Sequence, residues 1–380
     1  MKTDENTVRN SRSNAKPENS LFTVNNLLFL AIPLALALRW FNANSILVFA
    51  VALLSIYPLA EAMAEATEAI SATLGPTAGG LLNASLNNAP EIIIAMFALK
   101  NGLGNIVKAS IVGSILIELL FGLGLAMFLG GLKHSAQRFN EEAIQINGGL
   151  LTLCGFGLII PSIFHLSSPT AELELSFEIS AILLLIYFAN VGITLSRKPQ
   201  YAAGSLRHTL PLDSGTGHPP TRWSRTQSLS VLASAALALA VMSEVITGSI
   251  EPTSNQLGLT PMFSGIILLA GAGGIGEIIS ATRFARNNNM DLAVEASVGS
   301  SIQMILLVVP LLIFSAPLMG VNMNLLFEPI EVIVIALTVI ITRTLTADGR
   351  STWIEGLMLL AVYFMLAIGF YYLPESTGTL

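Results

Sequence analysis

LNNAPEIIIAMFALKNG, residues 86 to 102, places one carboxylate, Glu91, in a stretch that otherwise has the composition of a membrane-buried helix. An unpaired charge at the centre of such a helix costs at least about 2.5 kcal/mol. An acid in this position therefore needs a partner or a function, and the rest of the sequence has to supply it.

The whole chain has the composition of a polytopic membrane protein. It has 380 residues, of which 53% are hydrophobic and only 11% charged, with a mean hydropathy of +0.71. These values exclude an ordinary soluble domain. No basic run accompanies the formal net charge of -6, so we expect a lipid bilayer and no nucleic acid as partner. The one cysteine, Cys154, lies in an apolar segment and predicts a buried structural thiol.

Apolar windows recur along the chain at the length, about 20 residues, that crosses a bilayer core of about 30 Å. We therefore predict an all-α polytopic membrane protein with about eleven transmembrane helices. The windows lie near residues 24–40, 44–62, 76–101, 107–131, 143–165, 176–197, 227–249, 259–284, 291–315, 321–343 and 352–373.

The basic residues predict the orientation, because Lys and Arg gather in cytoplasmic loops. With eleven spans, all but three of the 18 Lys and Arg residues fall on one side of the membrane. The exceptions are Arg39, Lys100 and Lys108. This distribution predicts a cytoplasmic N-terminus and an external C-terminus, and the compact loops favour a prokaryotic cytoplasmic membrane.

One long polar stretch divides the chain. Residues 198–226 are rich in Pro, Gly, Ser and Thr and predict a cytoplasmic linker, in which His208 and His218 are expected to be solvated. The other predicted parts are a disordered cytoplasmic tail (1–23), an extra first transmembrane helix with its loop (24–43), a first repeat (44–197), a second repeat (227–373) and a C-terminal tail (374–380).

The two long parts are related by an internal repeat. A shift of 186 residues lays residues 91–118 on residues 277–304 without a gap, with 8 identities in 28 positions. Glu91 falls on Glu277, and Ser114 falls on Ser300. Each half then holds five spans, an odd number, so the copies cross the membrane in opposite senses. Two inverted five-helix repeats are typical of secondary transporters, whose substrate site lies near the midplane between the halves.

This architecture predicts that Glu91 faces Glu277. Without a counter-charge, two buried carboxylates that share a site are expected to hold at least one proton. A bound cation reverses that preference, so protons and cations compete for one place. Such competition is the basis of an antiporter.

Further oxygen ligands are needed, because hard cations such as calcium take about six to eight of them. Pro90 weakens the helix directly before Glu91, and the four glycines of GAGGIGE (271–277) predict a stronger helix interruption in the second half. Ser114 and Ser300 could instead be small-residue packing contacts between helices. The predicted ion-binding and proton-binding residues are Glu91, Glu277, Asn87, Asn88, Ser114, Glu118, Gly273, Gly274, Ser300 and Gln303, with Glu91 and Glu277 as the metal ligands.

Other acids lie outside this set. Glu61, Glu65 and Glu68 share one helix face at the cytoplasmic end of the second span, and Glu244 is placed at the far end of the seventh. Glu68 and Glu244 are candidates for a gate or relay. A solvated acidic helix end is the alternative interpretation.

The residues around both acids resemble a known family. TEAISATLGPTAGGLLNASLNNAPEIIIAMFALKNG in the first half, and SEVITGSIEPTSNQLGLTPMFSG with EASVGSSIQMILLVVPLLIF in the second, resemble the proton/calcium exchanger branch of the calcium/cation antiporter superfamily. The resemblance covers roughly residues 44–373. It implies an eleven-helix exchanger in which Glu91 and Glu277 bind calcium and protons alternately.

The chain departs from the family's Gly-Asn-Ala-x-Glu motif at several positions. Asn87 replaces the glycine of the first copy, and Gly274 stands where the second copy has asparagine. Ile278 takes the place of a frequent histidine, and Glu118 that of an asparagine. These changes leave two interpretations of the transported ion open. In one, the third carboxylate, Glu118, compensates the charge of a divalent ion. In the other, the smaller number of amide ligands favours sodium or potassium.

The leading hypothesis is therefore a proton-coupled cation antiporter that exchanges calcium for protons and needs no cofactor. The alternatives are an exchanger of sodium or potassium for protons, and a membrane ion sensor or scaffold that binds without transporting. An intramembrane enzyme is not expected, because the sequence lacks a zinc-type His/Glu motif, a serine nucleophile elbow and a phosphate-binding loop.

Overall fold

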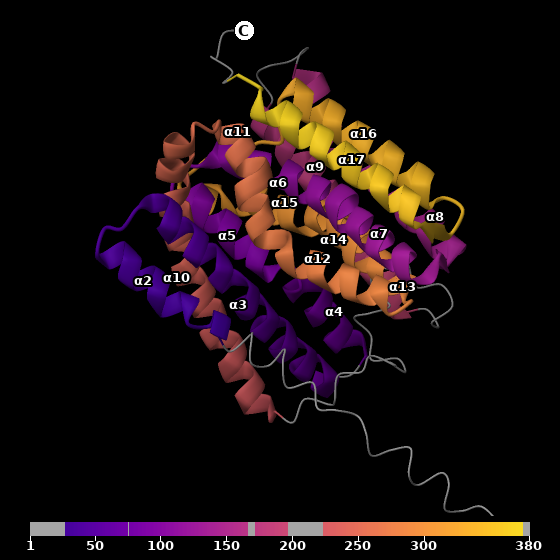
Figure 1. Ribbon diagram of the computed structural model, residues 1–380, viewed down its shortest axis with the longest axis horizontal. Helices are drawn as coiled ribbons and strands as arrows, with labels where there is room; N and C mark the ends of the chain where they lie inside the picture. Colours follow the sequence, from indigo (N-terminus) through magenta and orange to yellow (C-terminus); the bar gives the residue numbers. More distant parts are fainter. Residues whose placement is uncertain (1–26, 75, 166–171, 197–222, 375–380) are drawn as a thin grey trace, which may run out of the picture.

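The protein is an all-α polytopic membrane protein. The computed structural model describes residues 27–74, 76–165, 172–196 and 223–374 (Figure 1). Within these ranges the one sheet is a short antiparallel pair, in which β1 (Ala136–Arg138) pairs with β2 (Arg350–Thr352). The expected tail 1–23 and nearly all of the linker 198–226, including His208 and His218, lie outside the described residues, as does most of the tail 374–380.

The first half is a series of long helices with one wide π-helical turn. Its elements are α2 (Ala31–Trp40), α3 (Ser45–Leu74), α4 (Pro76–Leu86), α5 (Ala89–Lys100), α6 (Gly104–Leu116), the π-helix η1 (Ile117–Gly122), α7 (Leu123–His134), α8 (Glu141–His165) and α9 (Glu172–Ser196).

The second half contains more π-helical turns. Its elements are α10 (Arg225–Leu257), α11 (Pro261–Phe263), the π-helix η5 (Ser264–Leu269), α12 (Ala270–Arg286), α13 (Met290–Val294), the π-helix η6 (Glu295–Gly299), α14 (Ser300–Gln303), the π-helix η7 (Met304–Val308), α15 (Val309–Ser315), the 3-10 turn η8 (Pro317–Met319), α16 (Pro329–Thr346) and α17 (Trp353–Tyr371).

Local sequence signals account for several helix ends. Ser224 and Gln227 form a capping box at the start of α10, which satisfies two backbone N–H groups that the helix leaves free. The same helix ends at Gly258, whose φ of 65° is the left-handed conformation that glycine adopts without strain. Residues 225 and 226, which the linker was predicted to include, therefore belong to the helix.

Nine helices in the described residues are long and apolar enough to cross a membrane. The other two predicted spans differ from that pattern. The first is represented by α2, which has only 10 residues. The window 76–101 is not one helix, because the chain turns at Asn87 and Asn88 between α4 and α5. The fold class is confirmed, whereas the number eleven stays a prediction.

Three further predictions about the spans were wrong. The GAGGIGE stretch does not interrupt its helix, since α12 runs through it without a break. The window 321–343 is helical only from Pro329. Glu244 does not lie at the end of its helix, because α10 continues to Leu257.

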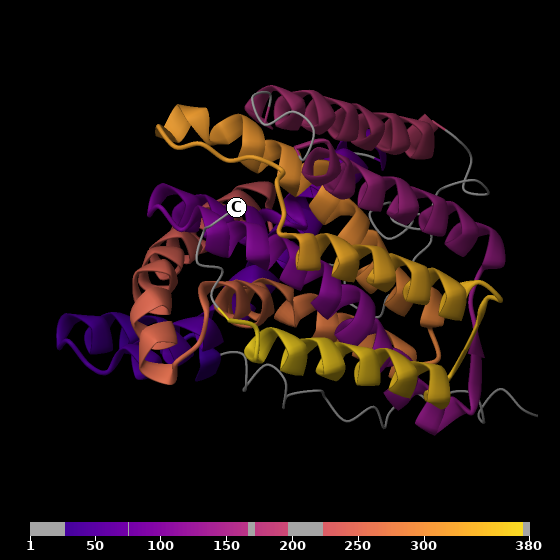
Figure 2. The same cartoon turned by 90° about the horizontal axis from the view of Figure 1, so that it is seen from above.

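Two continuous helical stretches form the centre of the molecule. In the most apolar window of Gly104–His134, 83% of the residues are buried, and in that of Met290–Met319 67% are. Around them, α2, α3 and α10 lie along one edge and α16 and α17 along the opposite one (Figures 1 and 2). The repeat-related helices α3 and α10 pack against each other. The two halves therefore interlock and do not form separate bodies.

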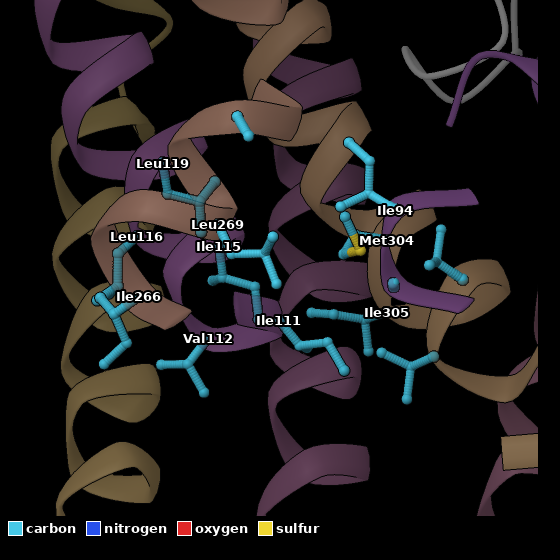
Figure 3. Close-up of a cluster of buried hydrophobic side chains, with 14 of the residues drawn as sticks. Ile94, Ile111, Val112, Ile115, Leu116, Leu119, Ile266, Leu269, Met304 and Ile305 are labelled. Atoms are coloured by element: carbon cyan, nitrogen blue, oxygen red, sulfur yellow. The ribbon is translucent and has the colours of Figure 1, made fainter. Parts of the chain in front are cut away.

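An apolar cluster between the halves depends on very close helix contact. Ile111, Val112 and Ile115 of α6 meet Ile266 and Leu269 of η5 (Figure 3). A Cβ atom added at Gly113 would lie 2.2 Å from the backbone oxygen of Ile266. Glycine is therefore required where α6 crosses η5, as is usual where membrane helices approach closely.

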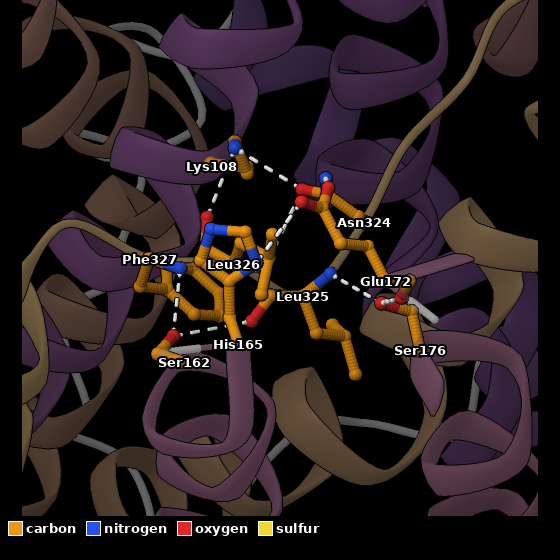
Figure 4. Close-up of polar contacts among 9 residues, drawn as sticks. All are labelled: Lys108, Ser162, His165, Glu172, Ser176, Asn324, Leu325, Leu326 and Phe327. Carbon is orange, nitrogen blue, oxygen red and sulfur yellow. Dashed lines mark hydrogen bonds and ion pairs between the residues drawn. The ribbon is translucent and has the colours of Figure 1, made fainter. Parts of the chain in front are cut away.

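The non-helical backbone of residues 321–328 is held by side chains of other helices. Alternate residues of this extended segment are buried, and Ser162 and Ser176 each accept a hydrogen bond from one of its backbone N–H groups at 2.9 Å (Figure 4). Lys108 Nζ donates to the backbone oxygen of Leu326 at 2.9 Å. Side chains thus replace the hydrogen bonds that a helix would make internally, which membrane interiors require.

The contact at Gly113 gives a stability prediction. Gly113→Ala is expected to lower the free energy of unfolding by about 2 kcal/mol, because its methyl group would overlap backbone atoms and the helices would have to separate. Thermal unfolding of the purified protein in detergent measures the effect. Gly192→Ala on α9 is the matched control, since a Cβ there meets nothing within 4 Å. Equal stability of the two variants would contradict this account of the helix crossing.

Candidate functional site

The turn between α4 and α5 places Glu91 in the first helical turn of α5. Asn88 is the N-cap residue, and Pro90 occupies one of the first two positions of the helix, where a missing N–H has no cost. Glu91 is only 8% exposed. The N-terminus of a helix carries partial positive charge, so a carboxylate is favoured there. The start of a new helix at Asn88 thus stabilises the negative charge of Glu91.

Gly273 brings the second half against this acid. A Cβ atom added at Gly273 would lie 3.1 Å from Glu91 Cγ and 3.5 Å from Glu91 Oε1. The helical backbone of α12 therefore passes directly beside the Glu91 side chain. The role of Gly273 is close approach between the halves, in place of the helix interruption that was predicted.

Two polar contacts connect the halves in the same region. Asn88 Nδ2 donates to Gln303 Oε1 at 2.9 Å, and Ser301 Oγ donates to Glu118 Oε2 at 2.6 Å. All four side chains are buried. The sequence had suggested three of them and missed Ser301, because its repeat-related residue is Ile115 and so the repeat gave no signal.

The three predicted acids lie near one another. The charge of Glu277 acts on both Glu91 and Glu118, and the charge of Glu118 acts on Glu91. Glu277 lies in the segment 275–280 of α12, whose residues are all partly exposed, whereas Glu91 and Glu118 are buried. Across the described residues, no three His, Cys, Asp or Glu side chains are arranged to hold a metal ion. A cation here would therefore need amide and hydroxyl ligands as well.

Several buried oxygen atoms around the acids lack a hydrogen-bond partner among the described residues. They are Asn88 Oδ1, Glu91 Oε2, Glu277 Oε2 and Ser300 Oγ. Most buried polar atoms in proteins are paired, so a group of unpaired ones can accept a further partner such as a water molecule or an ion. These atoms come from both halves, and carboxylate, amide and hydroxyl oxygens are the ligands that hard cations prefer.

A small cavity of about 20 Å³ adjoins Glu91. Ser110 and Ser114 of α6 add hydroxyl groups to its wall, and Gly273 adds backbone of the second half. The rest of the lining is apolar and comes from α5, α6, η5, α12, η7 and α15. This volume holds about one water-sized particle. Glu277 is not among the lining residues, so the cavity reaches only the Glu91 side of the pair.

Wide π-helical turns occur at equivalent places in the two halves. η1 begins at Ile117 and η7 at Met304, positions that the 186-residue shift places within one residue of each other. Glu118 lies in η1, and Gln303 directly precedes η7. Such turns are rare in helices and concentrate at functional sites.

Two predicted site residues lie apart from the unpaired atoms. Asn87 is in the turn before α5 with an exposed side chain. At Gly274, a Cβ would lie 3.4 Å from Ile117 Cγ2, so this position packs against η1.

The two candidate gate residues lie on helices other than those that carry Glu91 and Glu277. Glu68 is exposed on α3. Glu244 accepts from Asn101 Nδ2 at 3.5 Å, and its backbone oxygen accepts from Arg39 at 3.0 Å. Glu244 is thus part of the contact among α2, α5 and α10, and its gating role stays a prediction.

Comparison with known proteins assigns the family. The family model described as "Sodium/calcium exchanger protein" matches residues 44–195 and 227–372. The chain belongs to this family. The two matched segments lie within the predicted repeats 44–197 and 227–373, and the resemblance found in the sequence is confirmed.

Individual relatives are similar over nearly the whole chain. A Ca(2+)/H(+) antiporter of Aphanothece halophytica is 36% identical over 361 residues, which cover 91% of this chain and 96% of that protein. The Ca(2+)/H(+) antiporter ChaA of Bacillus subtilis is 36% identical, covering 91% and 98% respectively. The solved structure of native YfkE matches with a TM-score of 0.77 and 34% identity, covering 92% of this chain and 100% of that one.

The contact between Asn88 and Gln303 can be tested by a double-mutant cycle. Either Asn88→Leu or Gln303→Leu leaves one buried polar group unpaired and is expected to lower the free energy of unfolding by about 1 to 3 kcal/mol. The double variant is expected to lose less than the sum of the two, because it leaves neither partner behind. Unfolding in detergent measures all four proteins, and strictly additive losses would contradict a direct contact.

Proposed function

We propose that the protein is a proton-coupled cation antiporter that exchanges calcium for protons at the site between its two halves. The observation that carries the proposal is the group of buried, unpaired oxygen atoms that Asn88, Glu91, Glu277 and Ser300 contribute from both repeats. The calcium/proton antiporters among its relatives support the choice of ion.

In the proposed mechanism, Glu91 and Glu277 are the metal ligands and also the proton acceptors. Calcium binds only to ionised carboxylates, so cation binding releases protons. The affinity for calcium therefore falls as the pH falls. Exchange requires that the site can change the side of the membrane to which it opens when it holds either calcium or protons. The ionised site without a cation cannot make this change, because unpaired buried charges are costly.

Other ligands complete the proposed shell. Ser114 and Ser300 supply hydroxyl oxygens and Asn88 an amide oxygen, while Gln303 positions Asn88 through their hydrogen bond. Ser301 holds Glu118 beside this shell. A third carboxylate near a divalent ion adds compensating charge, which favours calcium over sodium or potassium in this chain. Exchange of sodium or potassium for protons, and an ion sensor without transport, remain the alternatives that experiment separates.

The relatives also guide the proposed setting. We place the protein in a prokaryotic cytoplasmic membrane, with its N-terminus inside and its C-terminus outside, and the similarity to a bacterial relative supports the prokaryotic setting. Residues 44–197 and 227–373 act as the two inverted repeats. Calcium and protons are the transported substrates, and no cofactor takes part.

The transport assay uses proteoliposomes with an imposed pH gradient. Wild-type protein is expected to take up calcium, and Glu91→Gln or Glu277→Gln to reduce uptake to background, because each removes a ligand and a proton acceptor. Glu251→Gln, at an exposed acid of α10, is the control and is expected to transport normally.

The same assay separates the alternatives when it is run with calcium, sodium, potassium and manganese. Uptake that survives in both acid variants would contradict the proposal. Proton-driven uptake of sodium or potassium alone would establish the first alternative. Saturable calcium binding without any flux would establish the sensor.

Gly273 offers a sharper test of the site geometry. Gly273→Ala is expected to weaken calcium binding about tenfold, or about 1.4 kcal/mol, because the methyl group displaces the Glu91 side chain. Gly276→Ala on the same helix is the matched control, since a Cβ there meets nothing within 4 Å. Calorimetric titration with calcium compares the two, and equal affinities would rule out Glu91 beside Gly273 as a ligand.

A further inference from the structure

Glu295 is a buried acid that the proposed exchange at Glu91 and Glu277 does not use. It begins the π-helix η6 and is 9% exposed. The 186-residue shift places Ala109 at its position in the first half, so Glu295 has no acidic counterpart in the repeat. It precedes Ser300 by five residues, roughly 7 Å along the helix. Glu295 therefore lies outside the paired site but on the same helical stretch.

The partner of Glu295 is Asn147 of α8. The Asn147 side chain lies within hydrogen-bonding reach of the Glu295 carboxyl group, and Asn147 is 2% exposed. Asn147 Oδ1 is buried and has no hydrogen-bond partner among the described residues. An amide carries its donor and its acceptor on one planar group. A protonated carboxyl can therefore accept from Nδ2 and donate its O–H to Oδ1, which an ionised carboxylate cannot do.

Among the described residues, no positively charged side chain of Lys, Arg or His pairs with Glu295. On the neighbouring element η1, Glu118 accepts from Ser301. On α13, Asp291 accepts from the backbone N–H of Asn140 at 2.8 Å. The other ionisable side chains on elements packed against η6 are Glu141, Glu142, Cys154, His165, Glu277, Arg283 and Arg286, and none of them bonds to Glu295.

The pair lies close to one end of the helix bundle. Asn147 is six residues from the start of α8, about 9 Å, and Glu295 is five residues from the start of α13. The contact between Asn140 and Asp291 joins these two helix starts. Arg343 lies along Gly148 of α8 and donates to Thr152 at 3.3 Å. In the proposed orientation this end is cytoplasmic, so a proton has about two helical turns to travel.

We propose that Glu295 and Asn147 form a proton-binding site, separate from the cation site, that exchanges its proton with the cytoplasm during transport. This inference rests on the proposed antiport function. In the step, the O–H bond of the Glu295 carboxyl breaks and the proton passes to cytoplasmic water, while Asn147 Nδ2 keeps its bond to the carboxylate. The helical stretch Met290–Met319 carries both Glu295 and the ligand Ser300, and so links the proton site to the cation site.

Proton release tests the proposal on the full-length protein. Calcium chloride is added to purified protein in weak buffer, and a pH-indicator dye counts the protons released for each calcium bound. Glu295→Gln is expected to release about one proton fewer than wild type, with calcium affinity changed by less than about twofold. Its amide can keep both bonds to Asn147, so the variant is expected to fold. Glu142→Gln, at an exposed acid of α8, is the control.

Infrared spectroscopy without calcium separates this inference from the proposed function. A carbonyl-stretch band of a protonated carboxylic acid is expected to titrate with pH, to vanish in Glu295→Gln and to shift to higher frequency in Asn147→Leu, which removes its hydrogen bonds. A wild-type protein that releases no protons on calcium addition would refute the antiport mechanism, and the band would still decide the assignment of Glu295. Equal proton release by Glu295→Gln and wild type, or a band unchanged in Glu295→Gln, would overturn it.

Discussion

The proposed site depends on the passage of α12 beside the side chain of Glu91. Gly273 presents no Cβ, so backbone of the second half lies against a carboxylate of the first half within the membrane. Glu91 reaches that place because the chain turns at Asn88 and begins a new helix there. A buried acid is tolerable only where a helix end, a cation or a proton offsets its charge. The other helices hold α12 and the start of α5 against each other.

The two repeats meet this constraint by different physical means. In the first half, Pro90 cannot continue a helix from α4, because it lacks an N–H and its ring clashes with the preceding turn, so the helix breaks. In the second half the glycines keep their backbone hydrogen bonds, and α12 stays continuous through Gly273 and Gly274. The two halves therefore bring their acids to the interface by different routes.

In the proposed mechanism, protons and cations have partly separate places. The acids of the paired site lie among unpaired oxygens from both halves, where a cation is the natural partner. Glu295 instead faces a single amide, Asn147, which suits a neutral acid better than a metal ion. The π-helical turn η6 lies between Glu295 and Ser300. A change in this turn would act on the amide-bound acid and on the cation ligand together, since both belong to one helical stretch.

The sequence by itself determined the membrane class and most of the spans, and it predicted the repeat and the pairing of Glu91 with Glu277. These follow from hydropathy and from one fixed shift along the chain, which are properties of the chain read in one dimension. Only the tertiary structure decided that Gly273 serves close approach, that Ser301 holds Glu118, that Asn147 lies beside Glu295 and that residues 321–328 are extended. Each of these depends on side chains that meet across helices far apart in the sequence, and no local pattern encodes such a meeting.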